Sequence, residues 1–277
     1  MRTIFILFDS LNRHFLECYG SDLLHTPNFR RLSEKAVTFD QHHVGSLPCI
    51  HARRDLQTGK LSFMHRSWGP LEPFDQSVFD QLRTAGVYSH LITDHYHYFE
   101  EGAGNYHTKY SSFEFVRGQE GDKWQAPIDA PLADWQARYH ADQFNEKTGS
   151  LPFHYMANRS HLEETGEFPS TQCFNAACTF LNANKAADDW FLQIETFDPH
   201  EPFFAPEDHR SNGRKQDVGR YHAGGLDRSR LSAGGTSMVG EKQNALLLRN
   251  RPHTVVGVPS GPCELRRRTA QRSDANT

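Results

Sequence analysis

The sequence predicts an α/β fold in which helices flank a mostly parallel sheet. Three short apolar runs at residues 2–8, 87–93 and 190–197 support this prediction. Each run is rich in Ile, Leu, Phe and Val, as buried strands are. Stretches with helical periodicity separate the runs, and alternation of strands and helices is typical of a parallel sheet.

The first predicted strand, residues 2–8, leads to a predicted helix that Thr26 caps and Pro27 opens. Threonine is a good N-cap, and proline is favoured at the first helical position. Residues 36–39 (AVTF) are predicted to form a short strand after this helix. We therefore expect a strand, a helix and a second, shorter strand in this part of the chain.

The later elements follow the same alternation. A helix is expected at 74–85, directly before the strand at 87–93, and another at 170–187, before the strand at 190–197. Residues 100–165 show weak periodicity. We interpret them as long loops with short helices that form one wall of a pocket.

Acids and histidines follow each of the three long strands. In open α/β sheets, ligands bind beyond the carboxyl ends of parallel strands. If the strands are parallel neighbours, these side chains converge on one edge of the sheet and form a site there. The residues are Asp9, Asp94, His95, His97, Asp198 and His200.

The composition divides the chain in two. Residues 1–210 hold all 20 Phe and all 4 Trp, with 18 Lys and Arg against 29 Asp and Glu, a net charge of −11. Residues 211–277 hold 12 Lys and Arg against 5 Asp and Glu, a net charge of +7, and one aromatic residue. So little apolar surface does not offset the entropy of ordering a chain. We predict an α/β domain at 1–210 and a disordered basic tail at 211–277.

Several function classes are excluded on composition. The five cysteines lack CxxC spacing, so neither a disulfide framework nor a zinc ribbon is indicated. The first apolar run reaches Asp9 too soon for a signal peptide, and no run has membrane-spanning length. The basic tail lacks interleaved aromatics. The expectation is a cytoplasmic protein with neither a membrane nor a nucleic acid as partner.

The segment 48–59 (PCIHARRDLQTG) carries the most specific signal. A cysteine at the start of a helix lies where backbone N–H groups and the helix dipole favour an anion. Two arginines follow within about one turn of Cys49. This is a suitable place for a phosphate or sulfate ester to bind.

The segment resembles the signature C-x-P-S-R-x-x-L-x-T-G of the formylglycine-dependent sulfatases of the alkaline phosphatase superfamily. Three further segments resemble the family in the same order: 93–97 (TDHYH), 117–122 (RGQEGD) and 197–203 (FDPHEPF). The signature residues in register are Cys49, Arg53, Leu56, Thr58 and Gly59.

The resemblance implies a role for each matching residue. Cys49 would be the precursor of the formylglycine nucleophile, with Arg53 and His97 as the other catalytic residues. Asp9 would bind a divalent metal, which in this family is usually calcium. His95, in place of a sulfate-binding lysine, and His200 would bind the substrate.

The resemblance also implies two partners: a small-molecule or carbohydrate sulfate ester, and the enzyme that generates formylglycine. His51 stands where the family has proline, a position that this enzyme reads. The sequence therefore leaves two states of Cys49 open, formylglycine and thiol. The family's second metal-binding half is not found after residue 204, which predicts a sulfatase-like fold that is incomplete at its C-terminus.

Three functions remain open from the sequence. The leading one is a sulfate-ester hydrolase in which the metal lowers the pKa of the formylglycine hydrate, whose hydroxyl attacks sulfur. The second is a phosphate or phosphonate ester hydrolase on the same scaffold, because both anions are tetrahedral. The third is an inactive, degenerate fragment that binds anions without turnover.

Overall fold

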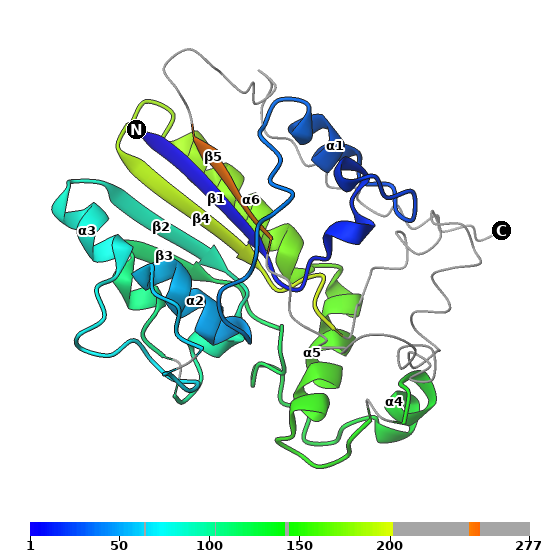
Figure 1. Ribbon diagram of the computed structural model, residues 1–277. Coiled ribbons are helices and arrows are strands. Elements are labelled where there is room, and N and C mark those ends of the chain that lie inside the picture. Colours follow the sequence, from blue (N-terminus) through cyan, green and yellow to red (C-terminus); the bar gives the residue numbers. More distant parts are fainter. Residues whose placement is uncertain (64, 103, 142–143, 202–243, 250–277) are drawn as a thin grey trace.

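The computed structural model describes all residues except 64, 103, 142–143, 202–243 and 250–277 (Figure 1). Its centre is a sheet with the strand order β3-β2-β4-β1-β5. The first four of these strands are mutually parallel, whereas β5 runs antiparallel to β1. The strands are β1 (Arg2–Phe8), β2 (Tyr88–Thr93), β3 (Ser112–Phe115), β4 (Trp190–Thr196) and β5 (Asn244–Arg249).

Helices cover both faces of the sheet, which confirms the predicted fold class (Figure 1). The long helix α6 packs on β4 and β2, and α3 packs against the opposite face beside α2. The α-helices are α1 (Pro27–Ser33), α2 (Cys49–Thr58), α3 (Val78–Thr84), α4 (Leu132–Arg138), α5 (Leu151–Thr165) and α6 (Pro169–Ala183). Short 3₁₀ helices lie at Arg13–Phe15, Glu17–Tyr19, Tyr96–Tyr98 and His107–Lys109.

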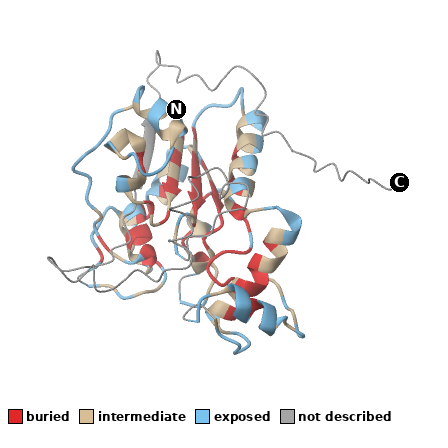
Figure 2. Ribbon diagram, turned by 90° about the vertical axis from the view of Figure 1, so that its right-hand side faces the viewer, coloured by how far each residue is buried: buried red, intermediate tan, exposed pale blue. Residues whose placement is uncertain are grey.

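Side-chain alternation along the strands builds two cores. Buried residues concentrate on the strands and on the helix faces next to them (Figure 2). Along β4, Leu192 and Ile194 face α6, whereas Phe191 faces α3 and α2. The core under α6 contains Ile92, Val116, Cys173, Ala177, Trp190, Leu192 and Ile194. The opposite core contains Cys49, Ile50, Leu71, Phe79, Leu91, Tyr98, Tyr106 and Tyr110. Because strands alternate their faces, Glu195 points to the same side as Phe191, toward α2.

Two local predictions were wrong. Residues 36–39 form no strand. Val37 and Phe39 are exposed and pack in no sheet, although β-branched and aromatic residues are common in strands. The stretch 100–165 contains a parallel strand, β3, and a helix of 15 residues, α5. The buried face of α5 mixes Met156 with polar residues such as Asn158, and this mixture hides the helical period.

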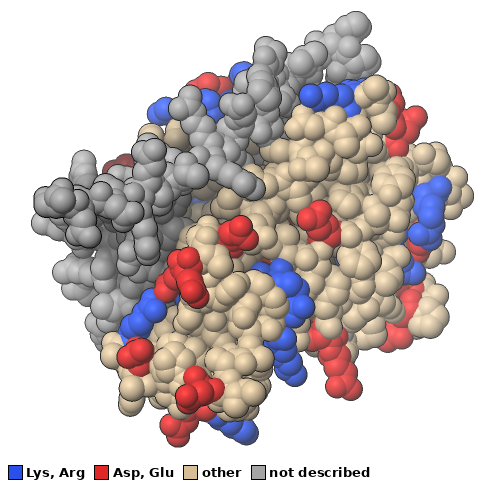
Figure 3. Space-filling view, turned by 180° about the vertical axis from the view of Figure 1, so that it is seen from behind, with Lys and Arg blue, Asp and Glu red and all other residues tan. Residues whose placement is uncertain are grey.

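The predicted division of the chain at residue 210 lies outside the described residues and stays a prediction, as does the disorder of most of 211–277. Within that predicted tail the structure describes β5, which pairs with β1. No helix among the described residues is both long and apolar enough to cross a membrane. On the face shown in Figure 3, acidic and basic side chains are interspersed over a mostly uncharged surface.

Candidate active site

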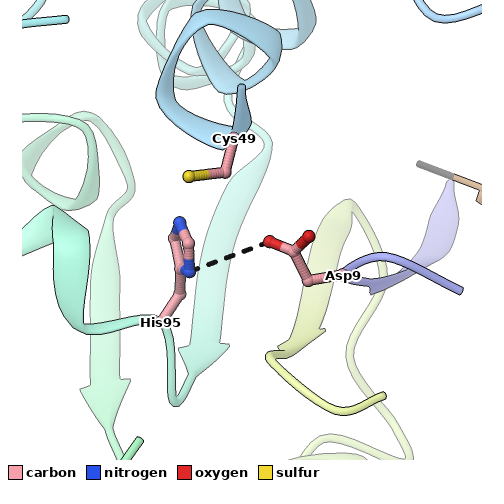
Figure 4. A group of neighbouring side chains, drawn as sticks. All are labelled: Asp9, Cys49 and His95. Carbon is pink, nitrogen blue, oxygen red and sulfur yellow. Dashed lines mark ion pairs between the residues drawn. The ribbon is translucent and has the colours of Figure 1, made fainter. Parts of the chain in front are cut away.

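The parallel strands bring the predicted residues to one edge of the sheet. Asp9 directly follows β1, and His95 lies two residues beyond β2. Cys49 is the first residue of α2, and its Sγ lies above the His95 ring and within 4.8 Å of the ligand atoms of both residues (Figure 4). All three side chains are buried: Cys49 is 3% exposed, and Asp9 and His95 are 0% exposed. Three elements far apart in the sequence therefore meet at one point.

Helix α2 presents its two consecutive arginines to different partners. Arg53 reaches the site, one helical turn after Cys49. The buried Arg54 instead reaches the carbonyl of Pro70, the hydroxyl of Tyr106 at 3.4 Å and the carboxylate of Asp75 at 3.5 Å. Arg54 therefore ties α2 to the neighbouring loops, while Arg53 supplies the positive charge of the site.

Arg53 lies between two buried carboxylates. Its Nη2 donates to Oδ2 of Asp9 at 2.8 Å, and its Nε donates to Oε1 of Glu195 at 2.8 Å. Burial alone would raise the pKa of the Asp9 carboxyl, but the charges of Arg53, His95 and His200 lower it. Within the described part of the chain, Nη1 of Arg53 has no hydrogen-bond partner. This nitrogen is a buried donor that an anionic ligand could satisfy.

Glu120 is a buried residue of this site that the sequence analysis missed. Its Oε1 lies 2.9 Å from Nδ1 of His95 and 3.2 Å from Nε2 of His97, and its Oε2 accepts the backbone N–H of His97 at 3.1 Å. Burial raises the pKa of Glu120 to about 7. On its other side, His97 lies 2.8 Å from Glu100 through Nδ1 and packs edge-on against Trp68. One carboxylate thus orients both histidines.

A strained loop holds Glu120 in place. Glu120 has a φ of 56°, which is unusual for a residue with a side chain, and Gly121 follows with a φ of 74°. A Cβ at Gly121 would lie 2.8 Å from Cγ of Leu151, so only glycine fits. Arg117 closes the loop through two hydrogen bonds to Asp122 at 2.6 and 2.7 Å. The glycines around Glu120 in the segment RGQEGD were the signal available in the sequence.

The carboxyl end of β4 contributes more peripheral groups. His200 is partly buried, stacks on Phe197 with a ring distance of 4.3 Å, and lies near enough for its charge to act on Asp9. Asp198 accepts a hydrogen bond from Gln119 at 3.1 Å. Burial and the neighbouring Asp198 raise the pKa of Asp94 well above its usual value. Burial raises the pKa of Asp198 as well, so both carboxyls of this second acidic pair are held less ionised than free carboxyls.

Two groups of side chains have the spacing of metal ligands: Asp9, Cys49 and His95, and then Cys49, His97 and Glu120. Within each group the ligand atoms all lie within 4.8 Å of one another. Calcium takes six to eight oxygen ligands. Each group offers one carboxylate. The described residues alone therefore do not fit a calcium ion.

The family model for sulfatases matches residues 2–247, which is most of the sequence. The chain belongs to the sulfatase family. This confirms the resemblance drawn from the segments around Cys49, His97 and His200.

Two curated relatives have sulfatase names. The N-acetylglucosamine-6-O-sulfatase of Bacteroides thetaiotaomicron is 25% identical over 126 residues, which are 44% of this chain and 23% of the relative. Human arylsulfatase D is 37% identical over 60 residues, which are 22% of this chain and 10% of the relative. The matched part of this sulfatase thus spans less than a quarter of either relative's length.

A solved structure supports the fold. The structure of Ps i-CgsB, determined in complex with k-i-k-neocarrahexaose, superposes with a TM-score of 0.52 at 16% identity. The match covers 79% of this sulfatase chain and 50% of the other chain. At this identity the likeness concerns the arrangement of the sheet and helices.

Proposed function

We propose that this sulfatase chain hydrolyses sulfate esters, with a formylglycine made from Cys49 as the nucleophile. The observation that carries the proposal is the position of Cys49. It begins α2 at the carboxyl end of the sheet, one turn before the buried Arg53 and beside Asp9 and His95. A nucleophile for an anionic ester needs a fixed positive charge nearby, and Arg53 supplies one.

The remaining residues have distinct roles in this proposal. Nη1 of Arg53 is the donor available to an oxygen of the nucleophile or of the ester. His97, oriented by Glu120 and Glu100, transfers a proton to or from the reacting oxygens. His95 and His200 bind the sulfate group. Removing one such fixed donor typically raises a barrier by about 3–4 kcal/mol.

The metal has no assigned step in this proposal. Asp9 remains the proposed carboxylate ligand of a divalent cation, calcium by family resemblance. A calcium site would need further oxygen ligands besides those of the described residues. For the substrate we propose a carbohydrate sulfate ester, because one matched relative is named an N-acetylglucosamine-6-O-sulfatase.

The test is to produce the chain together with a formylglycine-generating enzyme and to measure both modification and turnover. Mass spectrometry of the peptide containing Cys49 reports conversion. Hydrolysis of p-nitrophenyl sulfate, p-nitrophenyl phosphate and a phosphonate monoester reports the ester class. We expect activity on the sulfate that is lost in Cys49→Ser and kept in the matched control Cys173→Ser, a buried cysteine on the sheet-facing side of α6.

His51→Pro sharpens this test. The imidazole Nε2 of His51 lies 3.1 Å from the carbonyl of Arg66, and its ring is partly buried beside Trp68. Restoring the family's proline should raise the converted fraction of Cys49. Converted chain that turns over the phosphate faster than the sulfate would favour the phosphoesterase function. Fully converted, folded chain with no turnover of any ester would contradict the proposal.

A further inference from the structure

The thiol of Cys49 is shared by two groups of donors. Its Sγ lies within 4.8 Å of ligand atoms of Asp9 and His95, and also within 4.8 Å of ligand atoms of His97 and Glu120. Figure 4 shows the first group, in which the three side chains come from the end of β1, the start of α2 and the loop after β2 and point toward one space. Sulfur, imidazole nitrogen and carboxylate oxygen therefore all lie around one point.

The chemistry of this donor set favours a thiophilic ion over calcium. Zinc binds thiolate sulfur, imidazole nitrogen and carboxylate oxygen with four ligands, whereas calcium binds oxygen. The ligand atoms around a tetrahedral zinc lie about 3.5 Å apart. In each group the ligand atoms lie within 4.8 Å of one another, so zinc binding would shorten each of these distances by no more than about 1.3 Å.

The charge around Cys49 also favours a cation. Among the described residues that contact Arg53, His95 and His97, the carboxylates of Asp9, Glu195 and Glu120 are all buried. The buried guanidinium of Arg53 contacts both Asp9 and Glu195 through Nη2. Asp9 and Glu195 thus bring two carboxylates to one guanidinium, and a divalent ion would balance the remaining negative charge.

We propose that this chain, when Cys49 remains a thiol, binds a thiophilic divalent ion such as zinc through Cys49, His95 and Asp9, in preference to calcium. On binding, the Cys49 thiol gives up its proton to solvent and the thiolate sulfur bonds the ion. The histidine of the second group, His97, and Glu120 are the neighbours that can complete the coordination. This inference concerns the unconverted chain and does not depend on ester hydrolysis.

The test uses the full chain produced without a formylglycine-generating enzyme, with mass spectrometry verifying the Cys49 thiol. Cobalt(II) is the probe, because a cobalt–thiolate bond gives a near-ultraviolet charge-transfer absorption. We expect this absorption to saturate at one equivalent, to disappear when one equivalent of zinc is added, and to persist in excess calcium. Bound zinc should also protect Cys49 from alkylation by iodoacetamide, as read from peptide masses.

Matched variants assign the site. Cys49→Ser should abolish the cobalt–thiolate absorption, Cys173→Ser should retain it, and His95→Asn should weaken zinc binding at least about tenfold. Circular dichroism and thermal melting verify that each variant is folded. An absorption that survives in folded Cys49→Ser, or one displaced equally well by calcium, would overturn the proposal. Equal alkylation of Cys49 with and without zinc would overturn it as well, whatever the variants show.

Discussion

The two ends of the parallel sheet carry similar ion pairs in opposite surroundings. At the carboxyl end, Arg53 lies 2.8 Å from Asp9, and both side chains are at most 1% exposed. At the amino end, the ammonium group of Met1 lies 2.5 Å from Asp189, with 44% and 66% of the side chains exposed. The distances are alike, but water reaches only the second pair.

This difference in exposure indicates that the two pairs have different roles. An exposed pair is screened by solvent and contributes little to stability. A buried pair loses the hydration of both ions, and their attraction repays that loss only when the geometry is good. Burying Arg53 and its carboxylates is therefore a poor way to stabilise a sheet. It is an effective way to hold fixed charges where an ester would react.

Breaking the buried pair should give the largest effect. In Arg53→Met, the carboxylates of Asp9 and Glu195 lose their partner inside the protein, so the free energy of unfolding should fall by about 3–5 kcal/mol. Urea denaturation followed by circular dichroism measures it. The double variant Asp9→Asn, Arg53→Met should recover part of the loss, because it buries one fewer unpaired charge. A loss below about 1 kcal/mol in Arg53→Met would mean that water enters this end of the sheet.

Removing the charge of Glu120 should come next. Glu120→Gln keeps the shape of the side chain but cannot accept from His95 and His97 as a carboxylate does. Misplacing catalytic groups by about 1 Å can lower a rate about a hundredfold. We expect kcat on the sulfate ester to fall by that order while KM changes less. Glu114→Gln, an exposed glutamate on β3, is the matched control and should leave kcat unchanged.

A smaller effect is expected between the two ends, at His90 in β2. Its ring stacks on Phe180 at 5.0 Å, and burial lowers its pKa below the usual 6.5. The unfolded chain therefore binds a proton at His90 more readily than the folded chain does. The stability gained above pH 6.5 should be lost as the pH falls below it.

His90→Gln tests this pH dependence. Urea unfolding at pH values about one unit on either side of 6.5 should show a smaller acid-induced loss of stability in the variant. The exposed His14 offers a control, and His14→Gln should keep the full loss. An identical loss in His90→Gln and the unchanged chain would show that His90 titrates alike in both states.

The smallest effect is expected at the amino end of the sheet. Asp189→Asn removes one carboxylate from the ammonium group of Met1, but Asp188 lies 2.7 Å from the same nitrogen and both acids are exposed. We expect no measurable shift in the urea midpoint. A clear decrease would contradict the distinction between the two ends.

The sequence predicted the sheet because its three long strands are continuous apolar runs bounded by acids and helices. It also predicted that Asp9, Cys49 and His95 would meet. The apolar runs locate the ends of the strands, and the segment around Cys49 locates the start of a helix. Glu120 was missed for a physical reason. Its role depends on a left-handed backbone conformation and on contacts with two histidines more than twenty residues away, and no local period reports either.

Local sequence patterns also failed to predict α5 and the second neighbour of β1, because both depend on contacts between distant parts of the chain. Buried polar residues such as Asn158 and Arg159 interrupt the apolar face of α5, and Asn158 holds the loop at Asp122 and Gln125 instead of packing in a core. The antiparallel partner of β1 is β5, in a stretch whose composition predicted disorder. Pairing across more than 200 residues leaves no trace in composition.

The position of β1 in the sheet sets an order for folding during synthesis. β1 is made first, but its neighbours are β4, about 190 residues later in the chain, and β5, later still. At about 5–20 residues per second, β1 waits roughly 10–40 s on the ribosome before β4 emerges. During that interval both of its edges lack their native partner strands. Among the described strands, the one that leads to Asp9 therefore waits longest for its neighbours in the sheet.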